Sequence, residues 1–128
     1  MGFRDILNGM KRISLLSRKG GVAKTLSAMA LAQVLCEHGR VAVLDLDPEG
    51  SASSWARMAK ERGVDLGFEV YDPVSGSSMS ELDYLVVDTP PNDAKLLLTA
   101  AKHSDVIFVP LQPGQGEIDR LEPTLDVL

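Results

Sequence analysis

The feature that most constrains the fold is a repeated alternation between short apolar runs and helical patterns. The apolar runs occupy residues 13–17, 41–45, 68–71, 84–88 and 106–109. Helical patterns lie between them, over residues 24–38, 51–62 and 94–102, and another helix is predicted from about residue 116. Strands that alternate with helices are typical of an α/β protein with a mostly parallel sheet. We therefore predict an α/β fold with five strands, with residues 72–80 as a turn-rich loop.

Local signals predict where the helices begin and end. Gly39 is expected to end the first helix as its C′ residue, and Gly63 follows the end of the second. Asn92 or Asp93 can cap the helix over 94–102. The inner face of the first helix is predicted to consist of Leu26, Met29, Ala30 and Val34.

Composition and charge exclude several classes of protein. The chain has 128 residues, 45% of them hydrophobic, which suits one domain with a real core. It contains no apolar run near the roughly 20 residues that span a bilayer and no secretory signal, so a cytoplasmic protein is expected. Residues 1–63 carry a net charge of +4 and residues 64–128 carry −9. This asymmetry argues against nucleic-acid adhesion by the whole chain and is compatible with one anion site in the first half.

A glycine-rich segment lies between the first predicted strand and the first helix. It reads Ser17-Arg-Lys-Gly-Gly-Val-Ala-Lys-Thr25, and it departs from the pattern G-x-x-x-x-G-K-[ST] at Arg18 and Ala23. It matches the variant K-G-G-x-x-K-[ST], which begins at Lys19. A backbone curled in this way binds phosphate, with Lys24 on the β/γ-phosphates and the Thr25 hydroxyl on Mg²⁺. The simpler alternative is a glycine-rich turn with two solvated lysines.

Aspartates follow two of the predicted strands. Asp45 and Asp47 come at the end of the second strand, and Asp88 ends the fourth. Ligands of open α/β sheets bind beyond the carboxyl ends of the strands, so these side chains are expected at one edge with the phosphate loop. The alternative is that each aspartate only caps the helix that follows it.

Together these segments resemble the ParA/MinD family of deviant-Walker ATPases, and most closely its ParA-type partition members. Residues 19–25 resemble the deviant Walker A motif, and 84–91 look like the Walker B motif. Residues 44–55 are similar to the family segment D-x-D-P-Q-G-S-A, and 105–113 to the strand and loop that follow Walker B. The resemblance covers residues 11–128, with 1–10 as an N-terminal extension. It implies a P-loop NTPase sheet of order 3-2-4-1-5.

The resemblance also implies roles for individual residues. ATP and Mg²⁺ would be the cofactors, and Asp47 would orient the attacking water. Lys19 would reach the nucleotide of a partner subunit in an ATP-bound homodimer. Thr25, Asp45 and Asp88 would hold Mg²⁺. The nucleotide would contact Lys19, Gly20, Gly21, Val22, Ala23, Lys24, Thr25 and Leu26, although Leu26 stands where a second hydroxyl residue is common.

Family members are longer than this chain, and their later strands, adenine-contacting loops and C-terminal DNA-binding surface have no counterpart here. Two functions are therefore compatible with the sequence. One is a slow ATPase of plasmid or chromosome partition, which the family implies acts on non-specific DNA with a centromere-binding partner protein. The other is a truncated, non-catalytic module that retains the phosphate loop. DNA binding by this chain alone is not expected, nor is the membrane helix of MinD-type proteins.

Overall fold

The computed structural model describes residues 10–16, 24–73, 81–91 and 93–110 of the chain. Five strands and three helices alternate along these ranges, as the sequence predicts. The strands are β1 (Lys11–Leu15), β2 (Val41–Asp45), β3 (Glu69–Tyr71), β4 (Tyr84–Asp88) and β5 (Val106–Phe108). The helices are α2 (Lys24–Leu35), α3 (Ser51–Glu61) and α4 (Ala94–Lys102). The helix predicted from residue 116 lies outside the described residues.

The strands form one parallel sheet in the order β3-β2-β4-β1-β5, which confirms the predicted order. β4 lies between β1 and β2, and its register sets Asp88 beside Leu15 on one side and Asp45 on the other. Since all strands run in one direction, their carboxyl ends share one edge of the sheet. The two strand-end aspartates are therefore neighbours although they are far apart in the sequence.

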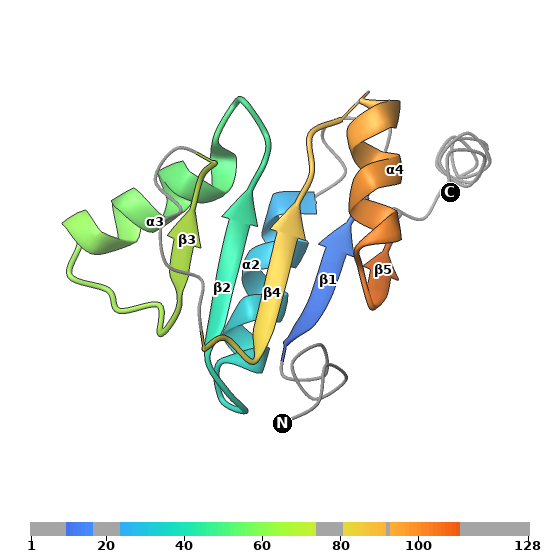
Figure 1. The fold of residues 1–128 in the computed structure, drawn as a ribbon. Helices are drawn as coiled ribbons and strands as arrows, with labels where there is room; N and C mark the ends of the chain where they lie inside the picture. Colours follow the sequence, from blue (N-terminus) through green and yellow to red (C-terminus); the bar gives the residue numbers. More distant parts are fainter. Residues whose placement is uncertain (1–9, 17–23, 74–80, 92, 111–128) are drawn as a thin grey trace.

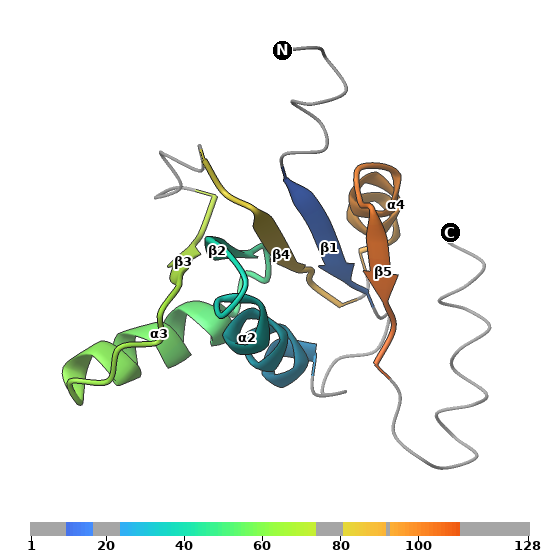
Figure 2. The same cartoon turned by 90° about the horizontal axis from the view of Figure 1, so that it is seen from below.

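Helices cover both faces of the sheet. Figures 1 and 2 show α2 and α3 on one face and α4 on the other, near β1 and β5. The larger core lies between the sheet and α2, where Leu15, Val43 and Val86 are buried. On the opposite face Ala42, Leu85 and Val87 form a second cluster, against which Met10 packs. The central strands β2 and β4 are buried on both faces, which explains their continuous apolar sequences.

The first helix buries a different face from the predicted one. Ala28, Met29 and Ala32 face the core, whereas Leu26 and Val34 are 54% and 58% exposed. Ala30 is exposed as well, so of the four residues predicted on the inner face only Met29 is correct. Apolar residues occur all around this helix, and hydrophobic periodicity therefore could not identify its buried side.

Several element ends also differ from the prediction. The first strand begins two residues earlier than expected, because Lys11 and Arg12 pair with Tyr84 and Leu85 of β4. Gly39 does not have the positive φ of a helix-ending glycine. It is needed for a close approach, since a Cβ there would lie 2.6 Å from Asp83 Oδ2. Asp93 caps α4 by accepting a 3.0 Å hydrogen bond from the Leu96 amide, which confirms one of the two predicted caps.

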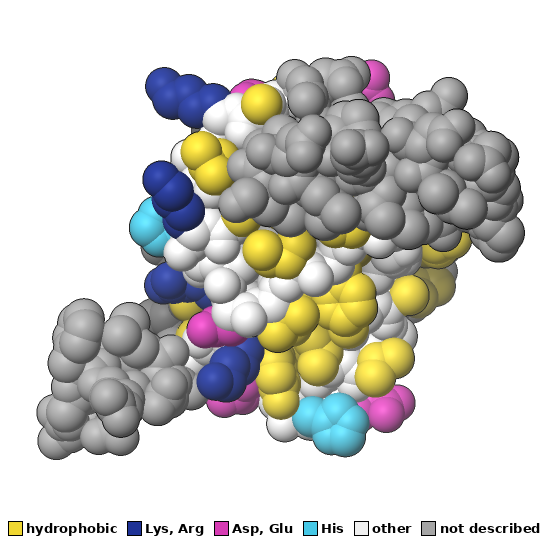
Figure 3. All heavy atoms as spheres, turned by 90° about the vertical axis from the view of Figure 1, so that its right-hand side faces the viewer, with side chains coloured by type: hydrophobic (Ala, Val, Ile, Leu, Met, Phe, Trp, Pro, Cys, Tyr) yellow, Lys and Arg dark blue, Asp and Glu magenta, His cyan; other side chains and the backbone are white. Residues whose placement is uncertain are grey.

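β5 has apolar side chains that the described residues leave largely uncovered. Val106, Ile107 and Phe108 are 45%, 37% and 47% exposed, and the strand pairs with β1 along one edge. Figure 3 shows hydrophobic side chains gathered on this side of the molecule. Within the described ranges, no strand pairs with the second edge of β5.

Candidate functional site

The residues predicted to bind phosphate follow β1 in the sequence and extend into the first turn of α2. β1 ends at the buried Leu15, and α2 begins at Lys24, so the strand and helix that flank the predicted loop are confirmed. Figure 1 shows the start of α2 at the edge of the sheet where β1 and β4 end. Of the predicted loop, Lys19, Gly20, Gly21, Val22 and Ala23 lie outside the described residues.

Asp88 is the centre of the described part of the site. Its carboxylate is completely buried at the end of β4. Oδ2 accepts a 2.7 Å hydrogen bond from the Thr25 hydroxyl. Oδ1 lies 3.9 Å from the ammonium of Lys24, a residue that is itself 6% exposed. No described residue donates a hydrogen bond to Oδ1. The structure thus brings together three of the predicted site residues from two elements.

Burial raises the pKa of Asp88 above its ordinary value of 3.8. The hydrogen bond from Thr25 and the positive charge of Lys24 act in the opposite direction, but they do not outweigh burial. The carboxylates of Asp45 and Asp47 raise this pKa further. The negative charge of these carboxylates therefore exceeds the positive charge of Lys24, the one described cation of the site. A bound cation would offset this excess of negative charge.

The donor set fits Mg²⁺ bound together with a nucleotide. Mg²⁺ is usually held by one or two carboxylates, water and substrate phosphates rather than by a cage of protein ligands. Thr25 supplies a hydroxyl, and Asp88 supplies a buried carboxylate oxygen to which no described residue donates a hydrogen bond. In the described ranges, no group of three or more His, Cys, Asp or Glu side chains could hold a metal without a ligand's help.

Asp47 begins the turn that leads from β2 into α3. The amide of Glu49 donates a 3.0 Å hydrogen bond to Asp47 Oδ1, and the amide of Gly50 donates a 2.9 Å bond to the Asp47 carbonyl. Gly50 has φ of 65°, a conformation that favours glycine, and α3 starts directly after it. The half-buried Asp47 side chain is thus held at the carboxyl edge of the sheet, near Asp88.

Asp45 has protein donors on both of its carboxylate oxygens. Oδ1 accepts a 3.1 Å hydrogen bond from the Asp47 amide. Oδ2 accepts bonds of 3.0 Å from the Ser53 amide and 2.9 Å from the Ser53 hydroxyl. Ser53 lies in the first turn of α3, so the capping role considered as an alternative for the strand-end aspartates is found at Asp45.

Leu26 and Thr89 directly follow Thr25 and Asp88 in the sequence. Leu26 follows Thr25 on α2 and is 54% exposed, and its nucleotide contact stays a prediction. Thr89 was not predicted; its buried hydroxyl donates a 2.7 Å hydrogen bond to the carbonyl of Leu15, where β1 leads into the predicted loop. The sequence signal that could have identified Thr89 is a hydroxyl residue directly after the strand-end Asp88.

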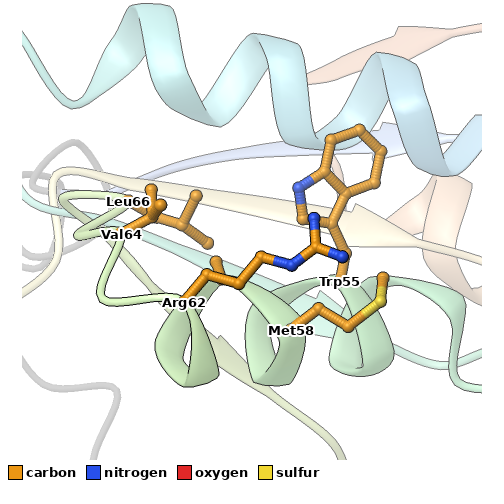
Figure 4. A pocket seen from close by; sticks show the side chains of 6 residues that line it. Trp55, Met58, Arg62, Val64 and Leu66 are labelled. Carbon is orange, nitrogen blue, oxygen red and sulfur yellow. The ribbon is translucent and has the colours of Figure 1, made fainter.

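An apolar pocket of about 410 Å³ lies beside α3 and the segment that follows it. Figure 4 shows Trp55 and Met58 on α3, Arg62 at its C-cap, and Val64 and Leu66 beyond its end. Trp55 is 38% exposed there.

The sheet order, the Lys-Thr pair at the start of α2 and the buried aspartate at the end of β4 define a P-loop nucleotide-binding α/β protein. Residues 13–125 match the family described as CbiA, the CobQ/CobB/MinD/ParA nucleotide binding domain. The chain therefore belongs to this ParA/MinD family.

Individual relatives agree with this assignment. The chain is 37% identical over 121 residues to maintenance of carboxysome distribution protein A from Gloeobacter kilaueensis, covering 88% of this chain and 54% of that protein. It is 48% identical over 56 residues, 43% of this chain and 22% of the relative, to the chromosome-partitioning ATPase Soj of Thermus thermophilus. The chain thus spans about half the length of the first of these relatives.

A solved structure shares the fold. The putative plasmid partition protein of Borrelia burgdorferi bound to AMPPNP superposes with a TM-score of 0.74 at 20% identity, covering 91% of this chain and 69% of that one. In the ranges that the structure describes, no helix is both long and apolar enough to cross a membrane.

Proposed function

We propose that the chain binds Mg-ATP through its phosphate loop and hydrolyses it slowly, as a partition ATPase of the ParA type. The observation that carries this proposal is the buried Asp88 carboxylate, which meets the Thr25 hydroxyl and the Lys24 ammonium. A buried carboxylate oxygen without a hydrogen bond destabilises the fold, so its presence at this edge favours a role toward a ligand. By their names, the relatives partition chromosomes or distribute carboxysomes.

The position of each residue at the site would determine its role in binding Mg-ATP. Lys24 lies beyond hydrogen-bond distance of Asp88 and therefore has N–H donors for phosphate oxygens, to which the start of α2 adds its positive end. Thr25 and Asp88 would hold Mg²⁺, Asp88 through bound water. Bound Mg²⁺ neutralises charge on the phosphates.

Two residues outside this group would complete turnover. Asp47 would accept a hydrogen bond from the attacking water, since its carboxylate lies at the turn after β2, close enough to raise the pKa of Asp88. Lys19, which belongs to the predicted loop, would contact the nucleotide of a second subunit in a face-to-face homodimer. Positioning and charge neutralisation of this kind supply most of the catalysis in phosphoryl transfer.

Binding is tested by calorimetry with Mg-ATP. We expect Lys24→Ala to abolish binding, and Lys60→Ala, which removes an exposed lysine from α3, to leave it unchanged. Circular dichroism checks that both variants fold. Binding that survives in folded Lys24→Ala would refute the assignment of the site.

Turnover is tested by phosphate release, with Asp47→Ala as the reference. We expect the wild-type chain to release phosphate from Mg-ATP. The Asp47→Ala variant should bind Mg-ATP but release no phosphate. A wild-type chain that binds Mg-ATP but releases no more phosphate than Asp47→Ala would refute the ATPase and support a non-catalytic module.

A further inference from the structure

We propose that Asp45 is a positioning residue, fixed by Ser53, which holds Asp47 in place for hydrolysis. The inference rests on the role proposed above for Asp47. It differs from the metal-binding role that the family resemblance implies for Asp45, and it assigns a function to the Ser53 hydroxyl.

The hydrogen bonds of Asp45 join two separate segments. One carboxylate oxygen accepts from the amide of Asp47, and the other accepts from the amide and the hydroxyl of Ser53. The first segment carries the water-orienting carboxylate, and the second is the first turn of α3. Asp45 therefore determines how far the Asp47 backbone lies from the start of that helix.

The local sequence makes this connection necessary. α3 begins after Gly50, which has no side chain to accept hydrogen bonds from the first-turn amides. Asp45 supplies the missing acceptor from the end of β2, where it is 1% exposed. A buried carboxylate bonded to three donors has one preferred orientation, and this orientation fixes the Asp47 amide.

The comparison with Asp88 separates positioning from metal binding. The two side chains lie in register on adjacent strands at the same edge. Among the described residues Asp88 Oδ1 is buried with no hydrogen-bond partner, whereas Asp45 Oδ2 accepts two protein hydrogen bonds and Oδ1 accepts one. An oxygen that already accepts from an amide and a hydroxyl is poorly available to a cation. The described donors thus engage Asp45 through three hydrogen bonds and leave Asp88 Oδ1 without one.

The first test measures amide hydrogen exchange by NMR in the full chain without nucleotide. In Ser53→Ala, we expect exchange at the Asp47 amide to accelerate about tenfold, the factor that corresponds to roughly one hydrogen bond, while the amides of β4 keep their protection. Ser54→Ala is the matched control, because Ser54 is the next residue on the same turn and its amide bonds to Gly50 instead. Unchanged exchange at Asp47 in Ser53→Ala would overturn the proposal.

The second test measures ATP hydrolysis over a Mg²⁺ titration. We expect Ser53→Ala to lower kcat about tenfold, with the KM for ATP and the half-saturating Mg²⁺ concentration unchanged. Ser53→Thr should retain activity and Ser53→Val should lose it; these two side chains have the same shape, so they assign the effect to the hydroxyl even if the alanine variant does not fold. A higher Mg²⁺ requirement in Ser53→Ala, or full activity of Ser53→Val, would overturn the proposal.

The two tests separate this inference from the proposed function. A wild-type chain that does not hydrolyse ATP would refute the proposed function, and the exchange at the Asp47 amide would still decide whether Ser53 fixes that residue. If Asp47→Ala is inactive and Ser53→Ala is fully active, the proposed function stands and the positioning role is refuted.

Discussion

Thr25, in the first turn of α2, donates a 2.7 Å hydrogen bond to Asp88 at the end of β4, across 63 residues of sequence. This bond joins the segment that follows the predicted phosphate loop to the strand that carries the acidic group. The two motifs therefore meet before any nucleotide arrives, and ligand binding does not have to bring them together.

Replacing Thr25 with valine removes the one described hydrogen bond to the Asp88 carboxylate and keeps the shape of the Thr25 side chain. Because a buried carboxylate then has no donor on either oxygen, we expect the free energy of unfolding to fall by about 1–3 kcal/mol. Urea denaturation measures the change, and Thr25→Ser, which keeps the hydroxyl, is the control. Equal stability of the valine variant and the wild type would contradict the expectation.

The pKa of Asp88 makes the stability of the ligand-free chain depend on pH. Because burial raises this pKa above 3.8, the folded chain holds the proton more tightly than the unfolded chain. The contribution of Asp88 to stability is therefore most favourable below pH 3.8, and it is lost as pH rises through the raised pKa of the folded chain. We expect the stability of wild type relative to Asp88→Asn to decrease as pH increases from 4 to about 7. Urea unfolding across this range checks the sign.

Binding of non-specific DNA by this chain should be weak or absent, with or without ATP. Such binding depends on neutralising phosphates with Lys and Arg, and residues 64–128 carry three of these against twelve Asp and Glu. A mobility-shift assay at low salt, with duplex DNA of arbitrary sequence, is the measurement. A salt-sensitive shift at micromolar protein would show that the first half of the chain alone supplies a DNA surface.

The exposed edge of β5 predicts self-association that does not need nucleotide. Ile107→Lys places a charge on a residue that is already 37% exposed, so the mass measured by light scattering should fall while the circular dichroism spectrum stays unchanged. Val64→Lys, a similar change at an apolar residue 55% exposed next to α3, should have no such effect. A wild-type chain that is strictly monomeric would contradict the prediction.

Association that needs ATP has a separate cause. Lys19→Ala should abolish an ATP-dependent dimer and leave the association through β5 unchanged. Light scattering with and without Mg-ATP separates the two species. If the ATP-dependent species persists in Lys19→Ala, the lysine has another role.

The strand order was predictable only through the family resemblance, whereas the grouping of the site residues follows from strong local signals in the sequence. Strand-end aspartates and a Lys-Thr pair at a helix start meet in any parallel sheet of this order. The sequence could not predict which side of α2 is buried, because apolar residues occur all around that helix. Leu26 and Val34 face outward in the structure. The partners of Asp45 also could not be predicted, because Ser53 meets it only through the left-handed turn at Gly50.

The strand order affects how the chain folds during synthesis. β1 is the first strand to be made, yet both of its neighbours in the sheet, β4 and β5, are made last. At about 5–20 residues per second, β1 must wait several seconds on the ribosome for a partner. Meanwhile α2, β2, α3 and β3 are available to assemble without it. The edge that carries Asp88 is therefore among the last parts of the domain to form, and β1 is the segment that a chaperone would have to protect.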